Sequence, residues 1–134
     1  MVGAWGWWGM STSNARRSNG SLRDKRRIEV AAQGRPCHLC GGPIDYALEP
    51  GQPESFEVDE IVPVSRYWET GWHPWLRRYV GPYASAQDAA TSSDNLAAAH
   101  RICNQRRGNK RLVNPAEAAQ ALAGQFPTSQ DWRK

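Results

Sequence analysis

Apolar residues along the chain fall into short periodic groups separated by Gly and Pro, which predicts several small elements rather than a few long ones. A helix is expected from Ser21 to Gln33. Ser21 and Asp24 resemble a capping-box start, and Gly34 supplies a stop. Its apolar side is thin, because Arg and Lys occupy most of the other positions.

Three further stretches predict the rest of the fold. Strand-forming residues from Phe56 to Val64 predict the core of a β-hairpin. Leu96 to Lys110 predicts a short strand followed by a helix that Gly108 ends. The run Asn114-Pro115-Ala116-Glu117 combines an Asn cap with Pro at the first helical position, and predicts a helix ending at Gly124. The expected fold class is α+β.

The 134 residues suffice for one domain. Residues 1–20, rich in Gly, Trp, Ser and Arg, predict a flexible N-terminal segment. A folded domain is expected over 21–113, and a C-terminal helix with a loose tail over 114–134. Within the domain, the aromatic-rich insertion 66–94 forms either a local mini-core or a stacking surface for nucleic acid.

Charge is more informative in its distribution than in its net value of +4. Seven Arg and Lys residues lie within 16–35, and a second basic block spans 101–111. An acidic stretch over residues 45–60 separates them. Basic flanks attract a polyanion, whereas a carboxylate cluster repels phosphate unless a cation lies between them. This arrangement favours a metal-using enzyme of nucleic acid, and the helix over 21–33 is either a solvated amphipathic helix or one that lies along a DNA backbone.

Hydropathy and cysteine content indicate the compartment. The mean hydropathy is −0.71, and no apolar run approaches the roughly 20 residues of a membrane span. The N-terminus lacks the pattern of a signal peptide, so a cytoplasmic location is expected. Three cysteines do not make a closed disulfide framework, and in a reducing compartment a C-x-x-C pair fits metal ligation better.

Two ligand pairs share this spacing: Cys37-x-x-Cys40 and His100-x-x-Cys103. Separated by a folded segment, they can close a tetrahedron of thiolate and imidazole donors, which zinc prefers. Four protein ligands leave no position for water, so this zinc would be structural. The alternative is that the cysteines are small buried hydrophobes and His100 caps a helix. His38 is a substitute ligand, and His73 is expected to be an ordinary loop histidine.

Two motifs near these pairs carry a family resemblance. They are Phe56-Glu57-Val58-Asp59-Glu60-Ile61-Val62-Pro63 and Asp94-Asn95-Leu96-Ala97-Ala98-Ala99-His100-Arg101-Ile102-Cys103-Asn104-Gln105-Arg106-Arg107-Gly108. With them the chain resembles the HNH nuclease family, above all its small zinc-containing bacteriophage members, over roughly residues 35–111. The resemblance implies a ββα-metal domain with a structural zinc knuckle and flanking helices.

The resemblance also implies site residues. Asp59 matches a metal ligand, and Asn104 matches a second ligand on the final helix. Asn95 matches the residue that ties a loop to the backbone near the base. The implied cofactors are one structural Zn²⁺ and one catalytic divalent cation, Mg²⁺ or Mn²⁺, which suits carboxylate and amide oxygens.

Glu60 departs from the family pattern, which usually has His as the general base at this position. Three interpretations stay open: Glu60 accepts the proton of the attacking water, it is a further metal ligand, or it marks a slow or inactive nuclease. Phosphate contacts are expected from five basic residues: Arg66, Arg101, Arg106, Arg107 and Lys110.

The implied activity is hydrolysis of phosphodiester bonds in duplex DNA, by nicking or double-strand cutting. None of the basic residues suggests readout of bases, so weak sequence preference is expected. The resemblance further implies a role in phage genome packaging with terminase subunits. Rival hypotheses are a zinc-knuckle DNA binder without activity, a terminase adaptor and an RNA-directed nuclease. If the enzyme hypothesis holds, Asp59→Ala and Asn104→Ala are expected to abolish cutting without unfolding the protein.

Overall fold

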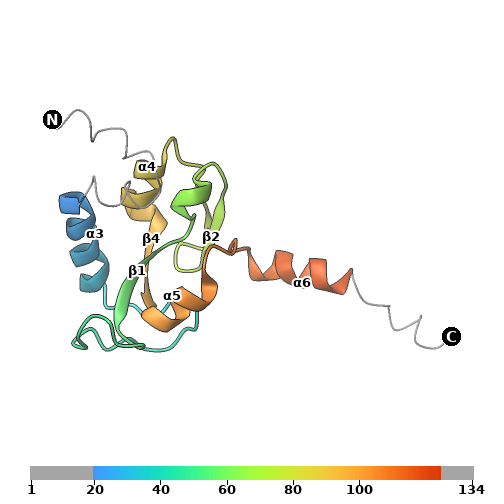
Figure 1. Cartoon of the computed structure of the whole chain (residues 1–134). Helices are drawn as coiled ribbons and strands as arrows, with labels where there is room; N and C mark the ends of the chain where they lie inside the picture. The colour runs from blue at the N-terminus through green and yellow to red at the C-terminus, as the bar shows by residue number, and fades with distance from the viewer. Residues whose placement is uncertain (1–19, 125–134) are drawn as a thin grey trace.

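The computed structural model describes residues 20–124 as a small mixed α+β domain with two small antiparallel sheets (Figure 1). The flexible segment expected at the N-terminus, up to residue 19, lies outside the described residues. So does the loose tail expected from residue 125 onward. None of the helices within 20–124 combines the length and the apolar character that a membrane span requires.

The two outer helices begin and end close to where the sequence predicts. Helix α3 spans Gly20–Ala32, and the chain then turns at Gly34, whose φ of 61° is accessible to glycine without strain. Helix α6 spans Pro115–Ala123. The side chain of Asn114 caps it by accepting a 2.9 Å hydrogen bond from the backbone N–H of Ala116. Both predictions are confirmed.

The central sheet joins two strands that are far apart in the sequence. Strand β1 (Phe56–Glu60) pairs antiparallel with β4 (Leu96–His100), with Phe56 opposite His100 and Glu60 opposite Leu96. The predicted hairpin over Phe56 to Val64 is therefore wrong. The strand ends at Glu60, Ile61 and Val62 enter the core, and the 3-10 helix η2 (Val64–Arg66) follows Pro63. Proline has no N–H for a ladder, which favours an end of pairing there.

The insertion folds into its own small elements. Strands β2 (Gly71–His73) and β3 (Arg78–Val80) form the second sheet, and helix α4 (Ala86–Thr91) and the 3-10 helix η3 (Ser93–Asn95) lead into β4. Its core contribution comes from small residues and two tyrosines that pack near Val64 and Val80: Ala86, Ala89, Ala90, Tyr67 and Tyr83. Trp68 is 60% exposed. The aromatic residues thus divide between a local core and the surface.

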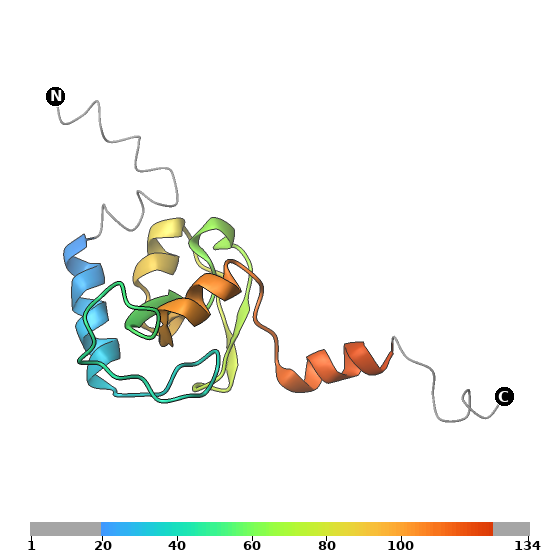
Figure 2. The ribbon, with the colours of Figure 1, turned by 60° about the horizontal axis from the view of Figure 1, so that its bottom comes forward.

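Helices cover both faces of the β1–β4 pair. Helix α3 packs on one face through Val30, which clusters with Phe56 and Leu96. Helix α5 (Arg101–Arg107) follows β4 directly and contacts both strands, as the sequence predicts for a strand followed by a helix. Helix α6 projects away from this body, and all of its residues are exposed (Figures 1 and 2). One end of the sheet, with the start of α5, carries the candidate metal centre.

Candidate metal centre and adjacent pocket

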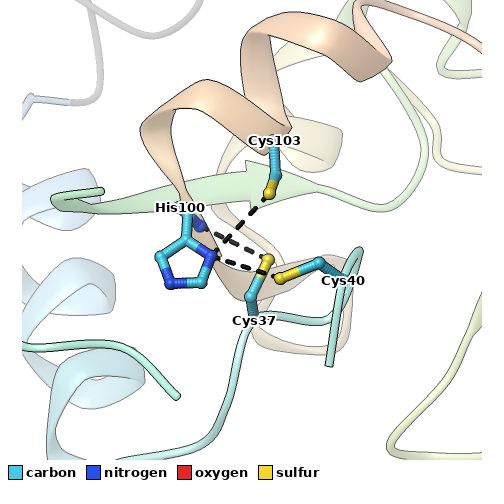
Figure 3. Close-up of side chains that lie close together, drawn as sticks. All are labelled: Cys37, Cys40, His100 and Cys103. Atoms are coloured by element: carbon cyan, nitrogen blue, oxygen red, sulfur yellow. Dashed lines mark hydrogen bonds between the residues drawn. The ribbon is translucent and has the colours of Figure 1, made fainter. Parts of the chain in front are cut away.

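Four potential metal ligands converge where the segment after α3 meets the junction of β4 and α5. One ligand atom each from Cys37, Cys40, His100 and Cys103 lies within 4.8 Å of the other three. Figure 3 shows the three sulfur atoms and the imidazole turned toward a common centre. The predicted pairing of the two C-x-x-C and H-x-x-C halves is therefore compatible with a structural zinc site.

The separations suit a tetrahedral ion. Zn–S bonds of about 2.3 Å and Zn–N bonds of about 2.0 Å place neighbouring ligand atoms roughly 3.5 to 3.8 Å apart. The Nδ1 atom of His100 lies 3.3 Å from Sγ of Cys40 and 3.7 Å from Sγ of Cys103. Both separations are close to those around a four-coordinate zinc.

Backbone groups around the cluster form hydrogen bonds with the side chains of two potential ligands, His100 and Cys40. Nε2 of His100 lies 2.9 Å from the carbonyl oxygen of Pro43, and donation to that oxygen leaves Nδ1 as the ligand atom. The N–H of Gly42 donates to Sγ of Cys40 and lowers the pKa of this thiol. Burial instead raises the pKa of Cys103 to about 12. A cation at the centre would supply the charge that a Cys103 thiolate needs.

A polar pocket of about 340 Å³ lies at the opposite end of β1 and α5. Its walls are the end of β1, the loop over residues 63–65, the end of α5 and Arg23 of α3. Three of the residues expected in a catalytic site, Asp59, Glu60 and Asn104, line this one pocket. The structure thus brings together residues from strand and helix that lie more than forty positions apart in the sequence.

Asp59 is buried and its carboxylate is held from two sides. Its Oδ2 atom lies 2.8 Å from Nε2 of His38 and 2.8 Å from Nη1 of Arg107. The Asp59 side chain is only 6% exposed. These contacts fix the orientation of the carboxylate before any ligand binds.

Arg107 does not fit the expected phosphate contact, because its side chain is only 4% exposed. Beside the Asp59 carboxylate, it donates to the carbonyl oxygens of Glu60, Ile61 and Lys110. An arginine saturated in this way closes the turn after β1 onto the end of α5. Burial requires such pairing for a cation, so we assign Arg107 to the structure of the site.

Asn104 reaches the same face of β1 as Asp59. Alternation along a strand puts Glu57 and Asp59 on one face, and α5 runs along that face. Nδ2 of Asn104 donates a 3.0 Å hydrogen bond to Oε1 of Glu57. With its amide nitrogen committed to Glu57, the Oδ1 atom of Asn104 is the one suited to a cation.

Glu60 emerges on the α3 side of the strand. Its Oε2 lies 3.1 Å from Nη2 of Arg23, and the side chains are 8% and 18% exposed. Nη1 of Arg23 also donates to the carbonyl oxygen of Ala90. A close charged neighbour of Glu60 is therefore an arginine from α3, and this helix is joined to the pocket by an ion pair.

Asn95 is fully buried and joins the loop after β1 to the residues before β4. Its Oδ1 accepts from the N–H of Val62, and its Nδ2 donates to the carbonyl oxygens of Val62 and Ala89. Loop bracing is the role expected for this residue. Asn95 does not line the pocket itself.

The other four basic residues expected to contact phosphate differ in whether internal contacts already hold their side chains. Arg66 pairs with Glu69, and Arg101 contacts the carbonyl oxygen of Gly51 and the carboxylate of Glu57. Arg106 and Lys110 are exposed near the end of α5. These two are best placed to approach a polyanion without breaking internal contacts.

His73 is buried in β2, so the expectation of an ordinary loop histidine is wrong. Its Nδ1 accepts hydrogen bonds from the N–H groups of Trp75 and Leu76, both at 3.2 Å. Burial lowers the pKa of His73 to about 4. The ring is neutral and stabilises the β2–β3 turn.

The sequence did not predict the roles of two residues of the site, His38 and Arg23. His38 was a substitute zinc ligand, but its ring faces Asp59 rather than the cysteines. Arg23 was one of several cations on a basic helix. The one available signal was the position of His38 within the knuckle, since a residue between two fixed ligands is itself fixed.

Neither family models, nor curated proteins, nor solved structures yield a match to this chain.

Proposed function

We propose that this protein is a metal-dependent DNA endonuclease of the HNH type, which hydrolyses phosphodiester bonds. The observation that carries the proposal is that one polar pocket combines the Asp59 and Glu60 carboxylates with the Asn104 amide. The strand–insertion–strand–helix order around it supports a ββα-metal domain, and so does the Cys₃His cluster at the opposite end of β1 and α5.

The donor set of the pocket fits a hard divalent cation. The two close contacts of the Asp59 carboxylate fall on Oδ2, so Oδ1 is the atom that would bind the ion. Oδ1 of Asn104 would be the second protein ligand, since Nδ2 is held by Glu57. Oxygen donors of this kind suit Mg²⁺ or Mn²⁺. The cation would neutralise charge on the scissile phosphate and stabilise the leaving oxygen.

Glu60 is the general base in this proposal. It lies at the end of β1 next to Asp59 and lines the same pocket, within reach of a water that attacks a phosphate held there. Arg23 holds the carboxylate in one orientation through its ion pair. A base that is positioned in advance loses less entropy on the way to the transition state.

Duplex DNA is the substrate that the charge distribution favours. Exposed Arg106 and Lys110 flank the pocket end of α5, and none of the described contacts suggests readout of bases. Weak sequence preference follows. A link to phage genome packaging and terminase subunits comes from the resemblance alone and is part of the proposal on that ground.

The test is supercoiled plasmid incubated with zinc-loaded protein and Mg²⁺, Mn²⁺ or a chelator of divalent cations. We expect nicked or linear products with Mn²⁺ or Mg²⁺, and a loss of at least about 100-fold in rate for Asn104→Ala. Gln105→Ala is the matched control, since Gln105 is the exposed neighbour on α5. Absence of products with every metal would refute the nuclease.

A specific observation favours a second candidate, a zinc-knuckle DNA binder that does not cut. Both acidic residues of the pocket are neutralised by arginines, Asp59 by Arg107 and Glu60 by Arg23. Such pairs serve structure equally well. The test combines gel shifts with the plasmid assay. If the protein binds DNA but leaves plasmid intact with every metal, it is a DNA binder, acting alone or as an adaptor, and not a nuclease.

A further inference from the structure

His38 lies between the metal centre and the pocket, because it follows the potential ligand Cys37 directly and its ring contacts Asp59 of the pocket. It occupies the position after Cys37 and two before Cys40, so both neighbouring ligands fix its backbone. The N–H of His38 donates a 3.0 Å hydrogen bond to the carbonyl oxygen of Ala98 on β4. These contacts fix the position of the ring in the domain, and the His38 side chain is 0% exposed.

Among residues 20–124, the carboxylate of Asp59 is the hydrogen-bonding partner of the ring. A carboxylate oxygen accepts hydrogen bonds, so Nε2 of His38 is the donor across the 2.8 Å separation. Nδ1 is buried without a hydrogen-bond partner among the residues that the structure describes. Burial of an unpaired polar atom costs stability, which a purely structural side chain would avoid. The hydrogen bond to Asp59 is the interaction that offsets the burial of Nδ1.

We propose that His38 is a positioning residue through which the zinc knuckle orients Asp59 toward the pocket. The inference rests on the proposed function, in which Asp59 holds the divalent cation. Cys103 precedes Asn104 on α5, and Cys37 precedes His38, so one zinc would position both oxygen ligands from two directions. Hydrogen bonds to the ligands of a metal typically change affinity or activity by roughly 10- to 100-fold when removed.

The experiment compares His38→Leu with His38→Gln in the zinc-loaded protein. The terminal amide nitrogen of Gln can occupy the place of Nε2 and donate to Asp59, whereas Leu fills the space without donating. Three quantities are measured: zinc content, Mn²⁺ affinity by calorimetry, and plasmid cleavage with kcat and KM for DNA separated. We expect His38→Leu to retain one zinc, to bind Mn²⁺ about tenfold or more weakly and to lose kcat at unchanged KM. His38→Gln should recover most of both losses.

The possible outcomes distinguish failure of this inference from failure of the proposed nuclease. If the parent cuts and His38→Leu matches it in Mn²⁺ affinity and kcat, the inference fails and the nuclease stands. If the parent binds Mn²⁺ without cutting, and His38→Leu weakens that binding, the nuclease fails and the inference stands. A parent that neither binds Mn²⁺ nor cuts overturns both. Loss of zinc in His38→Leu and His38→Gln alike also overturns the inference, because His38 would then serve the knuckle itself.

Discussion

The Cys₃His cluster and the polar pocket occupy opposite ends of the same two elements, β1 and α5, yet the sequence specifies them very differently. The cluster uses short-range spacing: each pair of ligands is separated by two residues, and the residue types are chemically restrictive. The pocket uses common residue types whose meaning depends on long-range contacts, such as Arg107 with Asp59 and Arg23 with Glu60. The spacing and type of the cluster residues can therefore be recognised in the sequence, whereas the tertiary partners of the pocket residues cannot.

The two regions also differ in what holds them together. A metal ion would tie the cluster, and its removal leaves three thiols and an imidazole with little reason to stay close. The pocket is tied by ion pairs and by hydrogen bonds to backbone carbonyls, which persist without any ligand. Variants in the two regions should therefore fail in different ways.

Cys37→Ser should produce the largest effect, the loss of the folded domain. A hydroxyl is a poor zinc ligand, and the contribution of a structural zinc can exceed the total stability of roughly 5 to 15 kcal/mol expected for a small domain. Circular dichroism and zinc content measure this. Chelator treatment of the parent should reproduce the effect and added zinc should reverse it; a cooperative melt of zinc-free Cys37→Ser near the parental temperature would contradict it.

Arg107→Met and Arg106→Met should separate structure from DNA contact on one helix. Arg107→Met leaves the buried Asp59 carboxylate without its cation, and we expect a loss of about 3 to 5 kcal/mol. Arg106→Met should change stability by less than about 0.5 kcal/mol and lower the salt dependence of DNA binding by about one charge. Urea denaturation and binding titrations at several salt concentrations measure these effects. Equal stability of the two variants would argue against the assignment of Arg107.

Asp59→Ala and Asn104→Ala should both stop cutting, but only the first should cost much stability. The sequence alone predicts an intact fold for both. The structure changes this expectation, because Asp59→Ala removes the acceptor of Arg107 and His38, at a cost of roughly 2 kcal/mol or more. Asn104→Ala loses only the hydrogen bond to Glu57 at a partly exposed site. Thermal melts beside plasmid assays decide, and indistinguishable melting temperatures would count against the buried Asp59 network.

His73→Asn should give the smallest effect, one visible only through its pH dependence. The folded pKa of about 4 lies below the ordinary value of 6.5, so the unfolded chain takes up the proton first. The contribution of neutral His73 is present above pH 6.5 and is lost as the pH falls toward 4. The Oδ1 atom of Asn can accept the same backbone N–H groups without titrating. We expect the variant to gain on the parent in melting temperature between about pH 7 and about pH 5; a constant difference would contradict this.

Secondary structure was predictable where one segment carries the whole signal. The Asn114 cap with Pro115 defined α6, and Gly108 defined the end of α5. The hairpin prediction for Phe56 to Val64 failed because the partner of β1 is β4, beyond an insertion that no local pattern can span. Apolar residues after Glu60 suggested a continued strand, but Ile61 and Val62 serve the core around Val80 instead.

Within the candidate site, residue type was predictable and residue partnership was not. Asp59, Asn104 and the four cluster residues follow from motif and spacing. Arg107 was indistinguishable in sequence from exposed Arg106 beside it, and only the packing of α5 on β1 separates them. His38 required knowledge of where the knuckle docks on β4. Such facts depend on tertiary geometry, which a single sequence does not encode in any local pattern.

The most direct test of the account is the number of Mn²⁺ ions bound by zinc-loaded protein, measured by calorimetry for the parent and for Asn104→Ala. We expect one Mn²⁺ per parent chain, and loss of that site in Asn104→Ala while the zinc content and the melting temperature stay unchanged. A parent that binds no Mn²⁺, or an Asn104→Ala variant that binds it as tightly as the parent, would contradict the account.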